Sequence, residues 1–591
     1  MVTAIVSRNG DLSETSVPPT MSRCPVEPSG LERVTVLKVL SVEQMRALER
    51  AANESGLPYS RMMENAGSAV ASWLLTQGVI GKRILVLVGP GNNGGDGLVA
   101  AWYLHRAGAL VSVYTVGRDR QGDTNWNRVT EAGIPVVSYE EDRHNAKLRR
   151  LTERADWVID AVLGIGVSRP FAGGLRSVLT TVAKALAKNS PLGVADYRSG
   201  FLPTPSTTPV CRPRVLAVDV PSGLHADTGQ VDPATLHADV TVSIAYPKIG
   251  QFLFPAAGYV GETVVADIGI PAELATQAAA NATTAADARS LLPQRPLDAH
   301  KGTFGRLLVV AGSPNYTGAA YLATTAAMRV GAGLVTLGIS EQLYPILAGK
   351  LTEATFALLP SDMGALIPEA VQALNDELDR AAALLLGPGL GRDPKTVHFV
   401  AQLLGCCGGD RRPRLGFVRP ATERGVQKSL PALVIDADGL TALESVPEWH
   451  RFLPPQSVLT PHPGEMARLL GVSIADVQAN RPERARSAAK EWNVVVLLKG
   501  ANSIVASPDG MVQINPFANP VLSTAGTGDV QAGIIAGLVA QGTKAFDAAV
   551  LGAYLLGLAG EMLSERLGDA GALANDLLEL LPKAIRRLKG C

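Results

Sequence analysis

Residues 89–97, with the sequence GPGNNGGDG, constrain the fold of this chain more than any other segment. They follow an apolar run at residues 84–88 and precede a helical pattern at residues 98–107. A buried strand, a glycine turn and a helix N-terminus form an anion-binding corner, because free backbone N–H groups and the helix dipole point there. The spacing G-x-G-x-x-G is weak evidence alone, and a tight turn without a ligand is the alternative.

The second half of the chain contains a similar corner. Residues 383–386 form an apolar run that leads into GPGLG at residues 387–391. Two such corners predict two nucleotide-sized sites rather than one large site. The length of 591 residues also favours two or more domains, because a single hydrophobic core stops growing well below that size.

Composition and net charge argue against several classes of protein and of binding partner. The chain has 54 basic and 54 acidic residues, so no net charge draws it toward nucleic acid or an anionic membrane. Its five cysteines lack C-x-x-C spacing, which predicts neither a disulfide framework nor a zinc site and fits the cytoplasm. The most hydrophobic region, residues 530–563, is broken by polar residues at 541–544 and predicts two buried helices rather than a membrane span.

Apolar strands alternate with helical patterns from residue 84 to 268 and again from 307 to 498. Such alternation is typical of parallel sheets with helices on both faces, whose ligands bind beyond the carboxyl ends of the strands. We therefore predict an α/β protein of two domains, the first a Rossmann-like doubly wound sheet. The predicted division is a flexible leader at 1–39, a first domain at 40–275 with an insertion near 189–214, a linker at 276–299, and a second domain at 300–591 with an insertion near 405–431.

Polar residues follow three predicted strands of the first domain. They are Asn92, Asn93 and Asp96 after one strand, Asp160 after a second, and Asp219 and Ser222 after a third. Each of them alone could be a turn residue. Because the carboxyl ends of parallel strands meet at one edge of a sheet, we expect these side chains to converge on one crevice.

The second domain offers residues suited to phosphoryl chemistry. Gly526 and Gly528 precede a helix, where successive N–H groups can bind a phosphoryl oxygen, and Asp529 can accept a proton from a hydroxyl group. The helix N-terminus and a nearby lysine are expected to favour the charged form of Asp529. The alternative is that Asp529 only caps its helix.

Two further residues follow strands of the second domain. Lys499 offers a positive charge for a phosphate group. His462 lies between two prolines, where a structural role and a ligand contact are equally open. The P-loop pattern G-x-x-x-x-G-K-[ST] is absent from the sequence, so any nucleotide is held differently from that of a P-loop enzyme.

These motifs together resemble those of bifunctional NAD(P)H-hydrate repair enzymes, in which an NAD(P)HX epimerase domain precedes an ADP-dependent NAD(P)HX dehydratase domain. The segments GPGNNGGDG at 89–97 and DVPSGL at 219–224 resemble motifs of the epimerase half. Five segments resemble motifs of the dehydratase half, whose fold is ribokinase-like. They are HKGTFGRLLVVAGS at 300–313, GPGLG at 387–391, DADGL at 436–440, TPHPGE at 460–465 and AGTGD at 525–529. The resemblance extends from about residue 40 to residue 589.

The resemblance implies roles for individual residues. The residues implied to bind the hydrate in the first domain are Asn92, Asn93, Gly94, Gly95, Asp96, Gly164, Ile165, Gly166, Val167, Ser168, Arg169, Pro170 and Asp219. The residues implied to hold a potassium ion are Asn93, Asp160 and Ser222. In the second domain the hydrate is implied to contact Ala319, Gly389, His462 and Asp529, and the adenine nucleotide Lys499, Gly500, Ala501, Asn502, Ser503 and Gly528. The expected catalytic residues are Asp219 and Asp529.

The same resemblance implies a reaction on damaged NADH or NADPH, in which water has added across a nicotinamide double bond. The first domain would interconvert the R and S epimers, and the second would dehydrate the S form with ADP, giving AMP and phosphate. Phosphoryl transfer to the added hydroxyl group would create a leaving group, with Asp529 as base and Mg2+ on the phosphates. We expect the hydrates and ADP as small-molecule partners of a cytoplasmic homo-oligomer, without nucleic acid or membrane.

Two other classes of function remain open. The second domain could be a small-molecule kinase, since GTGD also suits that chemistry, and the first could be a non-catalytic nucleotide-binding module. A kinase would release a stable phosphorylated product, whereas a dehydratase releases phosphate and restores the absorbance of reduced nicotinamide. A non-catalytic scaffold would not need Asn93, Asp160, Asp219 and Ser222 together.

Overall fold

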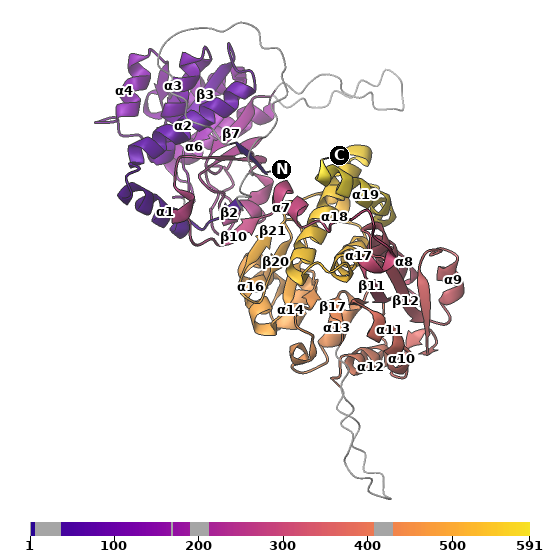
Figure 1. Ribbon diagram of the computed structural model, residues 1–591. Helices are drawn as coiled ribbons and strands as arrows, with labels where there is room; N and C mark the ends of the chain where they lie inside the picture. The colour runs from indigo at the N-terminus through magenta and orange to yellow at the C-terminus, as the bar shows by residue number, and fades with distance from the viewer. Residues whose placement is uncertain (1, 6–36, 167–169, 189–211, 407–429, 591) are drawn as a thin grey trace, which may run out of the picture. The chain divides into compact units, whose positions relative to one another are not determined.

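A computed structural model gives the fold of the chain (Figure 1). It describes residues 2–5, 37–166, 170–188, 212–406 and 430–590. The chain divides into two compact units, Met1–Ala279 and Ala280–Cys591, which are described separately below. The insertions predicted near 189–214 and 405–431 lie largely outside the described residues.

The first unit is built on one parallel sheet. Its strands lie in the order β1-β9-β8-β7-β6-β3-β4-β5, and each neighbouring pair is parallel. The strands of this sheet are β1 (Val2–Ile5), β3 (Arg83–Val88), β4 (Leu110–Thr115), β5 (Val136–Ser138), β6 (Trp157–Ala161), β7 (Arg214–Val218), β8 (Val240–Ile244) and β9 (Glu262–Ala266). The unit also contains the short strand β2 (Leu37–Val39) and the helices α1 (Val42–Glu54), α2 (Tyr59–Thr76), α3 (Asn92–Arg106), α4 (Thr124–Glu131), α5 (Ala146–Arg154) and α6 (Gly173–Lys188).

Helices cover both faces of this sheet because β3 is apolar on both sides. Ile84, Val86 and Val88 pack in one core with α2 and α3. The alternate residues Leu85 and Leu87 pack in a second core with α5 and α6. Successive side chains of a strand point to opposite faces, so an uninterrupted apolar run requires cover on both. The Rossmann-like doubly wound sheet predicted for the first domain is therefore confirmed.

The strand order of the first sheet reverses next to β3. From β3 the chain passes to β4 and β5 on one side, and then returns to β6, β7, β8 and β9 on the other. Strands β3 and β6 are direct neighbours, so the chain leaves their carboxyl ends in opposite directions. A crevice for a ligand is expected at this point, and the GPGNNGGDG segment begins there.

The second unit has a larger mixed sheet. Its strands lie in the order β13-β12-β11-β16-β17-β18-β19-β20-β21-β10. They are β10 (Ala280–Ala282), β11 (Arg306–Val310), β12 (Leu334–Ser340), β13 (Thr355–Leu359), β16 (Ala383–Leu386), β17 (Ala432–Ile435), β18 (Val458–Leu459), β19 (Val495–Leu498), β20 (Ile504–Ala506) and β21 (Val512–Ile514). The run from β13 to β19 is parallel, and β19, β20 and β21 are antiparallel. The strand order reverses between β11 and β16.

Helices enclose the core of the second unit. The longest of its helices are α8 (Thr317–Arg329), α12 (Pro394–Leu403), α14 (Pro463–Leu470), α16 (Arg481–Trp492), α17 (Thr527–Ala540), α18 (Ala545–Leu567) and α19 (Ala574–Lys589). Helix α18 is long and apolar enough to cross a membrane, but most of its apolar stretch is buried in the core of this unit together with α17. The prediction of two buried helices in this region is confirmed.

The structure corrects two predicted boundaries. Residues 1–39 were expected to be a flexible leader, but Val2–Ile5 pair in parallel with β9, and β2 also lies in this range. Residues 276–299 were expected to be a linker, but they contain β10, which pairs with β21, and helix α7 (Ala285–Ser290). Short strands without a long apolar run carry too little periodicity to be predicted from sequence. Residue 280 therefore begins the second unit.

Candidate active sites

The GPGNNGGDG segment of the first unit turns sharply between β3 and α3. A Cβ at Gly89 would lie 1.8 Å from the carbonyl oxygen of Val162, so only glycine fits where this turn meets the end of β6. Helix α3 begins at Asn92, with Gly91 as N-cap and without a side-chain cap. The backbone N–H groups of Gly94 and Gly95 donate to the carbonyl oxygen of Gly91 at 3.1 and 3.3 Å, so the N–H groups of Asn92 and Asn93 are the ones without a side-chain cap at the start of α3.

A partly buried arginine holds this turn in place. Arg118, which follows β4, donates from Nη1 to the carbonyl oxygens of Gly89 and Gly91, both at 3.0 Å. Its Nε donates to Asp123 at 2.7 Å, which orients the guanidinium group. Sequence reasoning missed this role, because the partner carbonyls lie far away along the chain.

The predicted polar strand ends converge. Ser222 donates from its backbone N–H to Asp160 Oδ2 at 2.9 Å and from its hydroxyl group to Asp160 Oδ1 at 2.6 Å. Asp160 is fully buried, and burial raises the pKa of its carboxyl group above the ordinary value. Asn93 is also buried, and a Cβ at Gly164 would lie 3.4 Å from its Oδ1. The strand ends that carry Asn93, Asp160 and Ser222 therefore meet, as expected.

Asp219 belongs to the same group of polar residues and has a strained backbone conformation. Its φ is 69°, in the left-handed region that few non-glycine residues adopt. Its Oδ1 accepts a hydrogen bond from the backbone N–H of Ile244 at 3.1 Å and one from the amino group of Lys248. Lys248 was not predicted from sequence. Its only signal was a lysine in the loop that follows β8.

Two more carboxyl groups belong to the same cluster. Burial raises the pKa of Asp96 well above its ordinary value, and the charges of Asp219 and Glu49 raise it further. Burial likewise raises the pKa of Glu49, which lies on α1, although Lys248 opposes that shift. Acidic groups with raised pKa values beside a lysine-paired carboxylate are suited to proton transfer.

The remaining predicted residues of the first unit surround this cluster. Gly94 and Gly95 are buried in the first turn of α3, whereas Asn92 is exposed. Ile165 and Gly166 lie in the turn after β6, and Pro170 is exposed. Residues 167–169, which include the predicted Val167, Ser168 and Arg169, lie outside the described residues.

In the second unit, the GPGLG loop after β16 contacts the start of α8. Gly389 has a φ of 64°, and a Cβ there would lie 2.7 Å from the Cβ of Ala319 and 2.8 Å from that of Tyr316. Ala319 and Gly389, both predicted to face the hydrate, are therefore in direct contact. Asp438 ties this loop to the end of β17, because its Oδ2 accepts a hydrogen bond from the backbone N–H of Gly391 at 2.9 Å.

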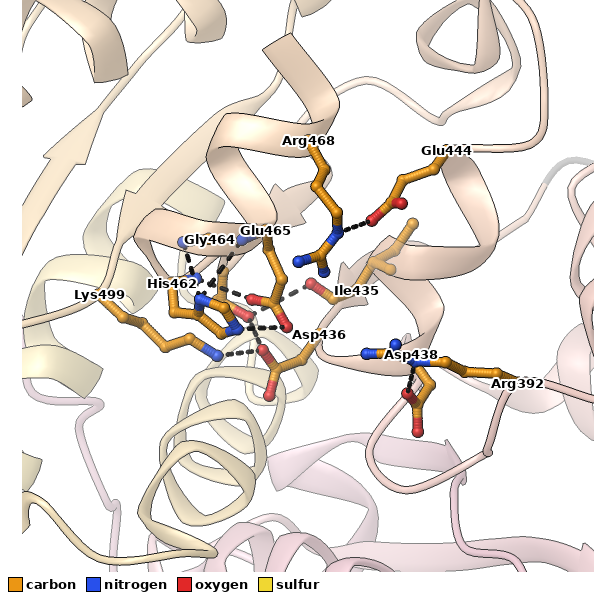
Figure 2. A network of polar contacts seen from close by, with 11 residues as sticks. Arg392, Ile435, Asp436, Asp438, Glu444, His462, Gly464, Glu465, Arg468 and Lys499 are labelled. Carbon is orange, nitrogen blue, oxygen red and sulfur yellow. Dashed lines mark hydrogen bonds and ion pairs between the residues drawn. The ribbon is translucent and has the colours of Figure 1, made fainter. Parts of the chain in front are cut away.

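A lysine–aspartate pair occupies the centre of the second site (Figure 2). The Nζ atom of Lys499 lies 2.5 Å from Asp436 Oδ1, which also accepts a hydrogen bond from the hydroxyl group of Thr460 at 2.7 Å. The other oxygen, Oδ2, is buried and has no hydrogen-bond partner among the described residues. The charges of Asp436 and Glu465 raise the pKa of Lys499 despite the opposing effect of burial. Lys499 is thus a charged group already paired with a carboxylate.

His462 and Glu465 form a reciprocal cap at the start of α14 (Figure 2). His462 Nδ1 accepts hydrogen bonds from the backbone N–H groups of Gly464 at 2.9 Å and Glu465 at 3.3 Å, and Glu465 Oε2 accepts one from the backbone N–H of His462 at 2.8 Å. Burial and the charges of Lys499 and Arg468 lower the pKa of His462. Burial raises the pKa of Glu465 to about 7. His462 therefore has a structural role, and its Nε2 atom lies 3.5 Å from Glu465 Oε1 on a half-exposed side of the ring.

The AGTGD segment brings Asp529 to the same cluster. Gly526 has a φ of 92° and is the N-cap of α17, which puts Asp529 at the third helical position rather than at the cap. A side chain at Gly528 would begin 3.5 Å from Lys499 Nζ and 4.0 Å from Asp436 Oδ2. Burial and the charge of Asp436 raise the pKa of Asp529 to about 7. The expectation that the helix and lysine would favour the charged carboxylate is wrong, because burial and Asp436 outweigh them.

The predicted nucleotide segment forms a tight turn between β19 and β20. Gly500 has a φ of 137°, and Ser503 donates to its carbonyl oxygen at 2.8 Å. Ala501 is exposed, and Asn502 is a buried residue with a φ of 51°. A further arginine missed by sequence reasoning supports this turn. Arg481 is buried and donates from Nη2 to the carbonyl oxygens of Leu498 at 3.2 Å and Lys499 at 3.0 Å.

The comparisons with known proteins match both units of the chain. A family model described as YjeF-related protein N-terminus matches residues 59–250, and one described as NAD(P)H-hydrate dehydratase matches residues 307–583. The bifunctional NAD(P)H-hydrate repair enzyme Nnr of Moorella thermoacetica is 40% identical over 562 residues, which cover 93% of this chain and 97% of that protein. The protein of the same name from Thermofilum pendens is 34% identical over 559 residues, with 94% and 97% covered.

A solved structure is also similar to the second unit. The ADP/ATP-dependent NAD(P)H-hydrate dehydratase of Bacillus subtilis, co-crystallised with ATP/Mg2+, is 30% identical and has a TM-score of 0.43. The match covers 52% of this chain and 97% of that one. Two α/β units, each with a polar cluster at the reversal or carboxyl edge of its sheet, define a two-domain enzyme for nucleotide-sized ligands. The chain belongs to the family of bifunctional NAD(P)H-hydrate repair enzymes, as the sequence motifs implied.

Proposed function

We propose that the chain repairs hydrated NADH and NADPH in two steps. The first unit interconverts the R and S epimers of the hydrate, and the second removes water from the S form at the expense of ADP, giving AMP and phosphate. The observation that carries the proposal is that each unit has its own cluster of buried titratable groups beside a glycine-rich turn. Family membership of the whole chain supports the same division.

In the first unit, the hydrate binds at the turn after β3. Gly94 and Gly95 line the first turn of α3 but donate their N–H groups to the carbonyl oxygen of Gly91, so the N–H groups offered to the phosphates are those of Asn92 and Asn93 at the start of the helix. Ile165, Gly166 and Pro170 border the opposite side, together with residues 167–169. While the epimers interconvert, the bond between the ring nitrogen and the hydroxyl-bearing carbon breaks and re-forms. Asp219 accepts the hydroxyl proton as this bond breaks and returns it as the bond re-forms, and Asp96, whose pKa burial raises, donates a proton to the ring nitrogen and takes it back.

Potassium binding at Asn93, Asp160 and Ser222 fits the chemistry of this set. Asp160 is a fully buried carboxylate that accepts hydrogen bonds from Ser222 and Val162, and a buried charge needs compensation by a cation or by more hydrogen bonds. Asn93 Nδ2 is buried without a partner among the described residues, and turning the amide over would place Oδ1 there. The Ser222 hydroxyl group keeps at most one lone pair for an ion, since it already accepts from Leu163 and donates to Asp160. The ion would neutralise Asp160 and fix the turns around it.

In the second unit, the hydrate lies against Ala319, Gly389 and His462. The nucleotide lies along the 499–503 turn and the N–H groups at Gly528. Asp529 accepts the proton of the added hydroxyl group while that oxygen bonds to the β-phosphorus of ADP, and AMP leaves. Phosphate then leaves with the hydroxyl oxygen, the neighbouring ring carbon loses a proton to the departing phosphate, and the ring double bond is restored. A pKa near 7 suits this role, because a base is most effective when its pKa lies near the working pH.

Mg2+ would supply charge neutralisation on the phosphates, and the second site offers oxygen ligands for it. Asp436 Oδ2 is buried and without a hydrogen-bond partner among the described residues, which fits a metal ligand better than a structural group. Asp438 and Glu465 lie nearby and could bind through water. Location in the cytoplasm and assembly as a homo-oligomer stay predictions.

One assay tests the proposal. The purified protein is incubated with mixed R and S hydrate, with and without ADP, and the absorbance of reduced nicotinamide and the release of phosphate are followed. We expect all of the hydrate to be converted with ADP and none without it, and phosphate to appear in step with reduced nicotinamide. A stable phosphorylated product would instead identify the second unit as a kinase. Conversion that stops at the S fraction would leave the first unit a binding module.

A further inference from the structure

Lys248 is a buried lysine in the candidate epimerase site that no sequence motif singled out. Its residue exposure is 1%, and its amino group donates to Asp219 Oδ1 and to the carbonyl oxygen of Ile244, the latter at 2.9 Å. A lysine is almost never this deeply buried unless it is paired, because removing its charge from water costs several kcal/mol. The ion pair with Asp219 therefore compensates the buried charge of Lys248 and is a structural element of this site.

The segment that carries Lys248 also holds the backbone of Asp219. Gln251 donates from Nε2 to the carbonyl oxygen of Asp219 at 3.2 Å, and Ser243 donates to the same oxygen at 3.4 Å. Gln251 in turn accepts from the backbone N–H of Lys248 at 2.7 Å through Oε1. The carbonyl group and the carboxylate of Asp219 are thus both held by residues of the 243–251 segment.

These contacts explain how Asp219 keeps its left-handed conformation. A non-glycine residue with a φ of 69° persists only where the surroundings over-determine it, and such residues gather at functional sites. The hydrogen bonds from Ile244 and Lys248 both end on Oδ1. Oδ2 is therefore the oxygen that can exchange a proton with a ligand, and its direction depends on the two bonds to Oδ1.

We propose that Lys248 is a positioning residue for epimerisation, which aims Asp219 Oδ2 at the hydroxyl group of the hydrate. The proposal rests on the proposed epimerase function of the first unit. Three carboxyl groups, from Asp219, Asp96 and Glu49, surround one amino group. Without Lys248, Asp219 keeps one of its two bonds to Oδ1 and faces two other acids without a counter-ion. Its carboxylate then turns away from Asp96 and from the position required for proton transfer.

The test uses the full chain, because the second unit reports whether the protein is intact. Epimerisation is measured on R hydrate with ADP, so that the unchanged second unit of the same chain converts the S epimer as it forms, and dehydration is measured separately on S hydrate with ADP. We expect Lys248→Met to lower kcat for epimerisation at least about 100-fold, the effect of removing a positioned proton-transfer group. KM for the R hydrate should change less than about threefold, and dehydration should not change. Lys82→Met is the matched control, since Lys82 is an exposed lysine of the same unit that lies 3.8 Å from Asp156.

A second variant separates positioning from folding. Lys248→Ala leaves space for a small amine, so added methylammonium should raise its epimerisation rate several-fold without affecting Asp219→Asn. If Lys248→Met fails to fold, the proposal is judged from Lys248→Ala, by whether added methylammonium raises its rate of epimerisation. A normal kcat in Lys248→Met, or an equal loss of epimerisation in Lys248→Ala with and without the amine, would overturn the proposal. A wild-type chain that does not epimerise at all would overturn the proposed function of the first unit instead.

Discussion

The substitution Asp529→Asn tests the second site most directly, because it removes the ionisable group and keeps the shape. Burial and the charge of Asp436 raise the pKa of Asp529 from 3.8 to about 7. A pKa raised by about three units corresponds to about 4 kcal/mol of destabilisation when the carboxylate is charged. This figure is an upper bound, since solvent reaches part of the side chain.

The sign of the effect on stability follows from the direction of the shift. Below about pH 4 the carboxyl group is protonated in both the folded and unfolded states and contributes nothing. As the pH rises from 4 to 7 the unfolded chain releases the proton first, so the folded state loses stability, and the full loss is present above pH 7. Asp529→Asn cannot ionise, so its free energy of unfolding should exceed that of the wild type at pH 8, by up to about 4 kcal/mol, and match it near pH 4.

Activity should change in the opposite direction. We expect Asp529→Asn to dehydrate the S hydrate at least about 100-fold more slowly, with ADP binding and epimerisation retained. In the wild type, kcat for dehydration should rise with pH through about 7, because the base must be ionised. Stability is measured by urea unfolding at the two pH values and activity by reduced-nicotinamide absorbance. A variant that dehydrates at a near-normal rate and loses about 0.5–2 kcal/mol at every pH would refute the reasoning, because that is the behaviour of a helix-terminal residue without a chemical role.

Three other substitutions test separate features. Ala437→Gly should raise the free energy of unfolding by about 1 kcal/mol in urea, since Ala437 has a φ of 51° and a ψ of −120°, a conformation that glycine adopts without strain. Gly389→Ala should abolish dehydration and leave epimerisation intact, because the new Cβ would lie 2.7 Å from that of Ala319. Asp160→Ala should remove the increase in Tm that potassium gives over sodium and weaken hydrate binding by calorimetry; a wild-type Tm that does not respond to potassium would count against the ion site.

The sheets could be predicted from the sequence because their strands are buried on both faces. A strand such as β3, covered by helices on each side, reads as an unbroken apolar run that is hard to overlook. The strands that were missed, among them β1, β10, β20 and β21, lie at the edge of a sheet or in its antiparallel part and are at most four residues long. β1 and β10 are defined by pairing with partners far away along the chain, which a local pattern does not contain, and β20 and β21 are too short for their alternation to stand out from the turns between them.

The sites were predictable to the extent that their residues adjoin a strand end. Asn93, Asp160 and Ser222 meet because parallel strands deliver their carboxyl ends to one edge. Lys248 and Arg481 could not be assigned in this way. Each reaches its partners through a long side chain, Lys248 to Asp219 and Arg481 to the carbonyl oxygens before Gly500. The spacing of residues in the sequence does not predict which partner the end of a long, flexible side chain contacts.

The protonation state of Asp529 shows a limit of a different kind, because the residues were predicted and the balance of forces was not. A helix N-terminus and Lys499 both favour a charged carboxylate. The sequence alone did not show the burial of Asp529 or the nearby charge of Asp436, which oppose them. In the structure the amino group of Lys499 lies 2.5 Å from Asp436. The negative charge of Asp436 offsets most of the effect that the positive charge of Lys499 has on the pKa of Asp529. What remains is burial together with repulsion from Asp436 and Asp438, and both raise the pKa. The same lysine–aspartate pair that would meet the nucleotide therefore sets the pKa of the base, and a change in either member should shift the pH dependence of dehydration.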